Sequence, residues 1–135
     1  MYNLTFVTRR RRQVLSDRTV ARLCLSAQSL ACDKYSFKCY AYCLMPDHMH
    51  LLAASESGSS LGEFVRHFKQ ISGFAYIQER GDHLWQISYY DHVLRSDEAV
   101  RPVAEYIWDN PVRAGLASGR AEYAFNGPPE YLKES

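Results

Sequence analysis

Two stretches with helical spacing of apolar residues, each lying between strand-like stretches, restrict the folds open to this chain. The helical stretches cover about residues 17–33 and 61–80. The strand-like stretches are Tyr2–Thr8, Phe37–Met45, His48–Ala54 and Leu84–Leu94. The order strand, helix, strand, strand, helix, strand predicts an α+β domain of the ferredoxin-like split βαβ type, an antiparallel sheet with two helices on one face.

Local signals predict where these elements begin and end. Ser16 is expected to cap the first helix, with Asp17 in its first turn. Ser60 and Glu63 form a capping box for the second helix, and Gly81 ends it. Pro46-Asp47 is a turn signal, so the two middle strands are expected to form a hairpin.

A third helix is predicted over Asp97–Asn110, capped by Ser96 and stopped by Pro111. It must pack at the sheet edge or on the open face. Pro102 either kinks this helix or marks its first regular residue. The segment after Gly115 offers no strong pattern, so we expect one domain at 1–118 and a C-terminal tail at 119–135.

Composition excludes several classes of protein. With 135 residues, 47% hydrophobic and 23% charged, the chain is expected to form one globular domain rather than a disordered one. No apolar run reaches the roughly 20 residues of a membrane span, and the basic cluster follows the N-terminal apolar stretch, unlike a signal peptide. The four cysteines form no CxxC pair, which disfavours disulfides and favours a reducing, cytoplasmic location. Cys39 and Cys43 share parity on a strand and are expected in the core, a zinc site with nearby histidines being the alternative.

Positive charge gathers near the N-terminus. Residues 1–46 carry eight Lys or Arg and two Asp or Glu, whereas the remainder is net acidic. Arg9–Arg12 form the densest cluster, which favours an anionic partner bound by one face. A solvated loop without a partner is the alternative.

His48-Met49-His50 is the first candidate for chemistry. Residues i and i+2 of a strand share a face, so both imidazoles point to the open side if Met49 faces the helices. They could then share one metal ion. The alternative is a pair of surface or half-buried histidines.

Tyr106 and Asn110 are the second candidate. Four residues apart on the third helix, they are expected to lie on one face. A tyrosine with its ordinary pKa of about 10 is a poor nucleophile, so it needs a metal that polarises its target or a close base. A tyrosine that only packs on the sheet is the alternative.

Four separated blocks, taken together, resemble a known family. LTFVTRR, CLMPDHMHLL, YYDHVLR and YIWDNPVRAGL occur in this order and cover roughly residues 2–118. The chain resembles the HUH-type single-tyrosine transposases, most closely the REP-associated (IS200-like) branch. The resemblance implies that His48 and His50 bind a divalent metal, Mg²⁺ or Mn²⁺, and that Asn110 completes the metal site. Tyr106 would attack a phosphodiester of single-stranded or hairpin DNA from repeat palindromes, leaving a 5′-phosphotyrosine and a free 3′-hydroxyl. Relatives of this kind include both monomers and homodimers.

One departure from the family pattern is Asp47, where the motif more often carries Asn. Asp47 either holds an imidazole N–H or caps the turn, and we expect the turn. Tyr89 and Tyr90 point to opposite faces and are expected to be core or DNA-stacking residues. We expect a structural role for His92, with a site neighbour as the alternative, and a surface position for His67 and His83.

Several cations are candidates for DNA phosphate contacts. Arg66 and Lys69 lie three apart on the second helix, where a solvated face is the alternative. The full set is Arg9, Arg10, Arg11, Arg12, Arg66, Lys69, Arg95 and Arg113. Two rival functions stay open: a hairpin-binding module without chemistry, favoured by Asp47 and Pro102, and a metal or small-ligand sensor.

Overall fold

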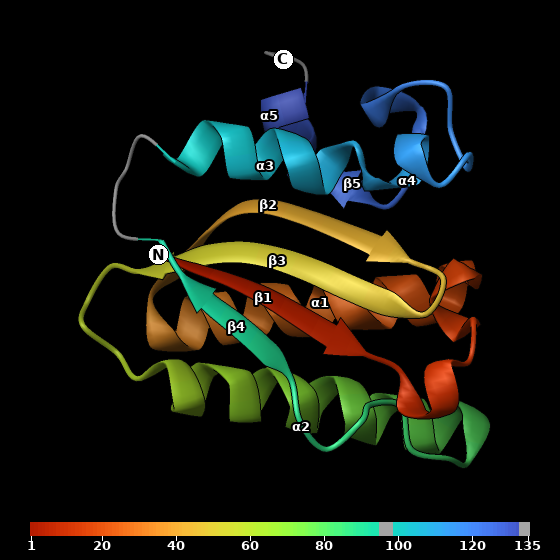
Figure 1. Ribbon diagram of the computed structural model, residues 1–135. Coiled ribbons are helices and arrows are strands. Elements are labelled where there is room, and N and C mark those ends of the chain that lie inside the picture. Colours follow the sequence, from red (N-terminus) through yellow and green to blue (C-terminus); the bar gives the residue numbers. More distant parts are fainter. Residues whose placement is uncertain (95–98, 133–135) are drawn as a thin grey trace.

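A computed structural model of the chain describes residues 1–94 and 99–132. One sheet lies between two layers of helices (Figure 1). The strands are β1 (Tyr2–Val7), β2 (Phe37–Met45), β3 (His48–Ser55), β4 (Tyr90–Val93) and β5 (Asn126–Gly127). The helices are α1 (Arg18–Tyr35), α2 (Leu61–Arg80), α3 (Val100–Trp108), α4 (Asn110–Arg113) and α5 (Pro129–Leu132). No helix within the described ranges is long and apolar enough to cross a membrane.

The sheet has the strand order β4-β1-β3-β2-β5, and every neighbouring pair is antiparallel. Its first four strands, with α1 and α2 on one face, form the split βαβ arrangement, so the predicted α+β fold is confirmed. The hairpin between β2 and β3 turns at Pro46 and Asp47, as predicted.

Side chains of β3 alternate between two separate cores. Met49 and Leu51 are fully buried beneath α1 and α2. Leu52 belongs to a second core on the other face, together with Ile107 and Trp108 of α3. The third helix therefore packs on the open face and not at the sheet edge, and the rest of this core comes from β2 and α5.

An irregularity in β2 separates two cysteines that were predicted to share a face. The register shifts between Cys39 and Ala41, so that Cys39 lies opposite Ala53 and Cys43 lies opposite His50. The extra residue reverses the alternation of the strand. Cys39 therefore packs at the core beneath α1, whereas Cys43 is buried beneath α3. The shared-face prediction is wrong, and these two thiols cannot hold one zinc ion together.

The fourth strand is shorter than the predicted Leu84–Leu94. Only Tyr90–Val93 pairs with β1 in a ladder, while Trp85 makes an isolated bridge to Thr8. Between them, the Lys69 ammonium binds two backbone carbonyls of the intervening segment and draws it toward α2. The strand is interrupted because these carbonyls are bonded to a side chain instead of to β1.

The two tyrosines of this region point to opposite faces, as predicted. Tyr89 packs on Phe6 in the helix-covered core, with ring centroids 5.8 Å apart. Tyr90 lies opposite Thr5 on the open face, and it is 65% exposed. The core assignment therefore holds for Tyr89 only.

The ends of α1 and α2 follow ordinary capping chemistry. Asp17, and not the predicted Ser16, caps α1, because its carboxylate accepts hydrogen bonds from the backbone N–H groups of Thr19 and Val20. Ser60 caps α2 as predicted, and Gly81 ends it with φ 72°.

The predicted third helix is divided into α3 and α4. The helix begins at Val100, so Pro102 falls in its first turn, where backbone N–H groups have no helical partner and proline costs little. Its other end is Trp108 rather than Asn110. Pro111 does not stop a helix: it is the second residue of α4, which begins at Asn110. Because Pro111 offers no N–H to the preceding turn, the helix is interrupted just before α4, at Asp109. The predicted Ser96 cap lies outside the described residues.

Residues 119–132 pack against the open face although their sequence shows no pattern. β5 pairs with β2, and Asn126 Nδ2 donates to the Trp108 carbonyl at 2.7 Å. Trp108 Nε1 donates in turn to the Gly127 carbonyl at 2.8 Å. This segment therefore fastens the end of α3 to the sheet. The division into a domain at 1–118 and a tail at 119–135 stays a prediction.

Candidate active site

Two imidazoles at the start of β3 form the centre of the candidate site. His48 and His50 both project from the open face, as predicted, and both are half-buried. Their ring centroids lie 4.8 Å apart, with the planes nearly perpendicular. Because β3 is hydrogen-bonded to β1 on one side and to β2 on the other, the backbone of this pair is held in place.

Asp47 holds the first imidazole. Its Oδ1 lies 2.6 Å from His48 Nδ1, and Arg11 donates to its Oδ2 at 2.9 Å. Burial is the largest single influence and acts to raise the pKa of Asp47, but the hydrogen bonds from His48 and Arg11 together hold that pKa below its usual value. The side chain therefore contacts an imidazole nitrogen, which is the alternative to the predicted capping of the turn. When His48 Nδ1 donates to the carboxylate, the Nε2 lone pair is left to bind a metal.

Thr5 holds the second imidazole from the neighbouring strand. Its hydroxyl lies 3.1 Å from His50 Nδ1, because β1 pairs with β3 in a register that sets these residues side by side. Burial first, and then the charges of His48 and Arg113, lower the pKa of His50 to about 4. His50 is therefore neutral near pH 7, which is the form that binds metals.

The candidate nucleophile is exposed and is held by an arginine. Tyr106 is 66% exposed on α3, so it is not the tyrosine packed on the sheet that the alternative describes. The Arg113 guanidinium lies over its ring, 3.7 Å from the centroid, and Nη2 donates to the Tyr106 carbonyl at 2.8 Å. The charge of Arg113 also helps to lower the pKa of His50.

Asn110 occupies the first position of α4, beyond the break in the helix. It is therefore not on one uninterrupted helix with Tyr106, contrary to the prediction. In Figure 1, α4 lies over the end of β2, close to the hairpin that leads to His48. The side chain of Asn110 makes no hydrogen bond to any residue in the described part of the chain, so its amide oxygen can serve as a ligand.

The arginine loop after β1 is only partly available to a ligand. Arg12 donates to Asp82 at 2.9 Å, and Arg9 lies 3.7 Å from the same carboxylate. Arg11 pairs with Asp47, whereas Arg10 forms no ion pair with a carboxylate in the described ranges. Arg10 and Arg11 also adopt left-handed backbone angles, with φ 58° and 52°. Such angles cost on the order of 1 kcal/mol per non-glycine residue, and this kind of strain gathers at functional sites.

The remaining candidates divide between surface and structural roles. Arg66 is exposed on α2, while Lys69 donates to the carbonyls of Gln86 and Ile87 at 2.8 Å each. His92 is exposed opposite Asn3 at the edge of the open face. Of the two histidines predicted at the surface, His83 is exposed and His67 is half-buried against Tyr35. Arg95 lies outside the described residues.

Two contacts of the site have no clear sequence signal. Thr5 has the correct parity in YNLTFVT to face the open side, but only the strand register brings it to His50. The clamp of Arg113 on Tyr106 depends on the break before α4, which no local pattern predicts in detail. No group of three or more His, Cys, Asp and Glu side chains within residues 1–94 and 99–132 could hold a metal, so the two imidazoles need oxygen ligands from elsewhere.

Comparison with known proteins places the chain in a family. The chain is 30% identical over 120 residues to a Haemophilus influenzae protein assigned by name to the REP-associated tyrosine transposases, with 76% of this chain and 68% of that protein covered. A second, uncharacterised protein of the same organism is 29% identical over 73 residues, which span 52% of this chain and 41% of the relative.

Two solved structures share the fold. A REP-associated tyrosine transposase bound to a REP hairpin superposes with a TM-score of 0.80 at 22% identity, covering 98% of this chain and 78% of the other. A candidate transposase from Deinococcus radiodurans R1 gives a TM-score of 0.61 at 25% identity, covering 78% and 86%. The family model described as "Transposase IS200 like" matches residues 1–110. The chain therefore belongs to the IS200-like transposase family.

Proposed function

We propose that this transposase cleaves and rejoins single-stranded or hairpin DNA through a covalent bond to Tyr106. The observation that carries the proposal is the arrangement of the two imidazoles. His48 and His50 face the same side of the sheet, and each has its Nδ1 engaged, by Asp47 and by Thr5. When each Nδ1 donates its proton to these oxygens, both Nε2 lone pairs are left to bind one divalent ion.

The residues present fit such an ion. Two neutral imidazoles with the amide oxygen of Asn110 give a mixed nitrogen and oxygen set, and a phosphate oxygen of the substrate would add to it. Imidazole ligands favour Mn²⁺ over Mg²⁺, so we expect tighter binding of Mn²⁺. When bound, the ion would neutralise charge on the phosphate and make the phosphorus easier to attack.

The chain's own residues perform the transfer. Tyr106 Oη attacks the phosphorus, and the bond from phosphorus to the 3′ oxygen breaks. The phenol gives up its proton to solvent, and the leaving 3′ oxygen takes one up, so a 5′-phosphotyrosine and a free 3′-hydroxyl result. Arg113 orients the ring and carries positive charge beside the phosphate. A 3′-hydroxyl that attacks the phosphotyrosine reverses the step and rejoins the strands without ATP.

The DNA partner is inferred from a solved relative and from the arginines near the site. The solved relative is bound to a REP hairpin, and we infer that this chain also takes hairpins from repeat palindromes. Arg11 pairs with Asp47 beside His48, and the neighbouring Arg10 is exposed, so we infer that Arg10 contacts phosphates of the strand there. Because α3 packs on the sheet of its own chain, we infer that one protomer supplies both the histidines and the tyrosine, whether the protein is a monomer or a homodimer.

Two sequence features, Pro102 and Asp47, favour a binding module without chemistry, but each has another explanation. Pro102 lies in the first turn of α3, where it leaves the helix intact. Asp47 supports His48 by a hydrogen bond. Neither feature argues against catalysis.

A denaturing-gel adduct assay tests the proposal. Labelled hairpin oligonucleotides from repeats that flank the gene are incubated with Mn²⁺ or Mg²⁺ and with the wild-type, Tyr106→Phe or His48→Ala protein. The wild type is expected to give a metal-dependent shifted band. Tyr106→Phe should bind DNA without an adduct, and His48→Ala should lose both metal binding and cleavage. Hairpin binding with no adduct from any of the three proteins would instead support the binding module.

A further inference from the structure

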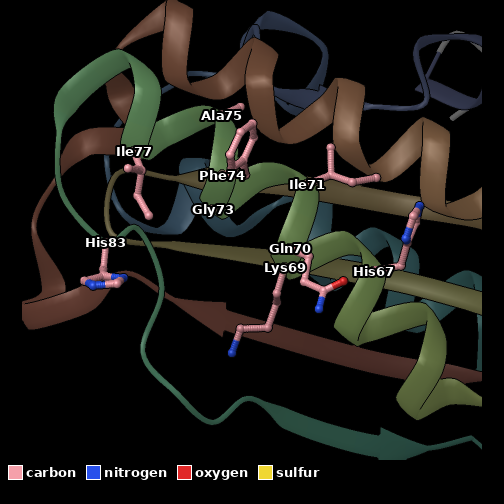
Figure 2. Close-up of a pocket in the computed structure, with 9 residues that line it drawn as sticks. All are labelled: His67, Lys69, Gln70, Ile71, Gly73, Phe74, Ala75, Ile77 and His83. Carbon is pink, nitrogen blue, oxygen red and sulfur yellow. The ribbon is translucent and has the colours of Figure 1, made fainter.

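A second surface rich in cations lies along α2. A hollow of about 750 Å³ has a lining that includes Lys69, Gln70 and His83, which Figure 2 draws as sticks. A hollow of about 400 Å³ shares Lys69 and Gln70 with the first and extends to Arg66 and Ile87. A third hollow, of about 480 Å³, shares His83 with the first and Ile87 with the second. The shared residues join the three hollows into one surface, which we call the α2 groove.

The α2 groove combines apolar side chains with three cations. Arg66 and Lys69 of α2 line it on one side, and Arg9, which lies 3.7 Å from the Asp82 carboxylate, lines it at the end near β1. Among the described residues, none that lines the three hollows is Asp or Glu, and no carboxylate pairs with Arg66 or Lys69. Lys69 gives two of its three protons to backbone carbonyls, and one is left to donate to a ligand. Unpaired cations in a groove attract a polyanion.

A rigidly held isoleucine stands at the middle of the groove. The side chain of Ile87 is fully exposed. A single exposed apolar residue is ordinary, but the backbone here is fixed. Lys69 binds the carbonyls of Gln86 and Ile87, and Gln86 N donates to the Val7 carbonyl at 2.9 Å. In Figure 2, Lys69 points from α2 toward this segment, which leads from His83 to β4. Apolar side chains presented in this way contact or wedge between nucleobases.

The arginine loop connects the α2 groove with the histidine pair. Arg9 lines the groove, and Arg11 pairs with Asp47, which holds His48. Arg10 lies between them and is exposed. A nucleic acid bound at the histidine pair therefore meets Arg10, which forms no ion pair with a carboxylate of the described residues, and beyond it Arg9 at the end of the groove. This continuity favours DNA over a peptide as the occupant.

We propose that the α2 groove is a second DNA-contacting site, in which Arg66 and Lys69 bind phosphates and Ile87 packs against a base. It would hold the part of the substrate that lies beyond the cleaved phosphodiester, such as a hairpin. The proposal rests on the proposed function only in taking DNA as the substrate, because binding in the groove needs neither Tyr106 nor a metal.

The test compares salt-dependent binding of a fluorescent hairpin oligonucleotide by anisotropy. Arg66→Gln is expected to weaken binding about fivefold and to lower the slope of log K against log salt by about 0.7–0.9, because one phosphate contact is lost. Ile87→Ala is expected to weaken binding about fivefold with an unchanged slope, because an apolar contact releases no counterions. Arg22→Gln and Leu30→Ala, exposed positions on α1 away from the groove, serve as matched controls and should bind as the wild type does.

A second arm separates this proposal from the proposed catalysis. Adduct formation is measured on a short single strand that spans only the cleavage site and cannot reach the groove. Both groove variants should form adducts there at the wild-type rate. The proposal is overturned if hairpin binding by Arg66→Gln and Ile87→Ala matches that of the controls, or if adduct formation on the short strand falls in the same proportion. Absence of any adduct with the wild type would count against Tyr106 chemistry alone, since the anisotropy arm still reports on the groove.

Discussion

The Arg113 guanidinium lies over the Tyr106 ring, 3.7 Å from its centroid, and also donates to the Tyr106 carbonyl at 2.8 Å. One side chain therefore fixes both the aromatic ring and the end of the helix that carries it. A cation over an aromatic face contributes about 0.5–1 kcal/mol at exposed sites. For an exposed tyrosine, this contact is the main restraint on the direction of the hydroxyl.

Arg113→Lys should therefore slow the chemical step more than it weakens DNA binding. Lysine keeps the charge but loses the planar stack and the forked hydrogen bonding. Misplacement of a reacting group by about 1 Å can cost on the order of 100-fold, so we expect adduct formation about 10- to 100-fold slower in single-turnover assays. Arg101→Lys on α3, the helix that carries Tyr106, is the matched control, because this arginine only pairs with Glu105. Equal rates for the two variants would contradict a positioning role.

Asp47→Ala should weaken metal binding. Without the carboxylate, His48 Nδ1 loses its partner at 2.6 Å and the imidazole is no longer held in one tautomer and orientation. Loss of such a supporting partner typically lowers metal affinity by about 10- to 100-fold. Titration of the protein with Mn²⁺, followed by calorimetry, measures this directly.

Asp47→Asn separates the hydrogen bond from the charge. The amide oxygen can still accept from His48 Nδ1, while the ion pair with Arg11 at 2.9 Å is lost. We expect Mn²⁺ affinity within a few-fold of the wild type. If Asn behaves as Ala does, the charge of Asp47 and not its hydrogen bond supports the site.

Sequence patterns predict those parts of the fold that depend on local spacing. The alternation around Met49 places both histidines on the open face, and the order of elements gives the split βαβ sheet. The shift at Tyr40 in β2 is different, because a bulge depends on pairing with β3 and leaves no mark in a single strand. β5 is not predictable from a local pattern either. It has only two residues, and it is held by two long-range hydrogen bonds, from the Asn126 amide to the Trp108 carbonyl and from the Trp108 indole to the Gly127 carbonyl.

The candidate site shows the same limit. The family resemblance implies His48, His50 and Tyr106 as a set, but the contacts that orient them come from residues distant in sequence. Thr5 reaches His50 through strand register, and Arg113 reaches Tyr106 through the turn before α4. The position of Lys69 on α2 predicts a contact with phosphate. The sequence does not predict that the Lys69 ammonium also donates two hydrogen bonds to backbone carbonyls.

His50 should make the metal-free protein less stable in mild acid. Its pKa is about 4 in the folded chain and about 6.5 when unfolded. Between these values the unfolded chain binds a proton that the folded chain does not, so stability falls as the pH drops from about 6.5 to 4 and levels off below. The loss is on the order of 3 kcal/mol. Urea unfolding of chelator-treated protein at several pH values should show a smaller loss for His50→Gln, while His92→Gln, exposed on β4, should keep the wild-type dependence.

Asn126→Ala should loosen the tyrosine helix from the sheet. The buried amide donates to the carbonyls of Trp108 and Arg120, and its removal leaves both without that partner. An unsatisfied buried polar group costs about 1–3 kcal/mol. We expect a lower midpoint of thermal unfolding and a slower adduct reaction, because the end of α3 is no longer fixed. Gln78→Ala removes an exposed amide from α2 and should change stability by less than about 0.5 kcal/mol. A stability loss without any change in adduct rate would show that the tail supports the fold but does not position Tyr106.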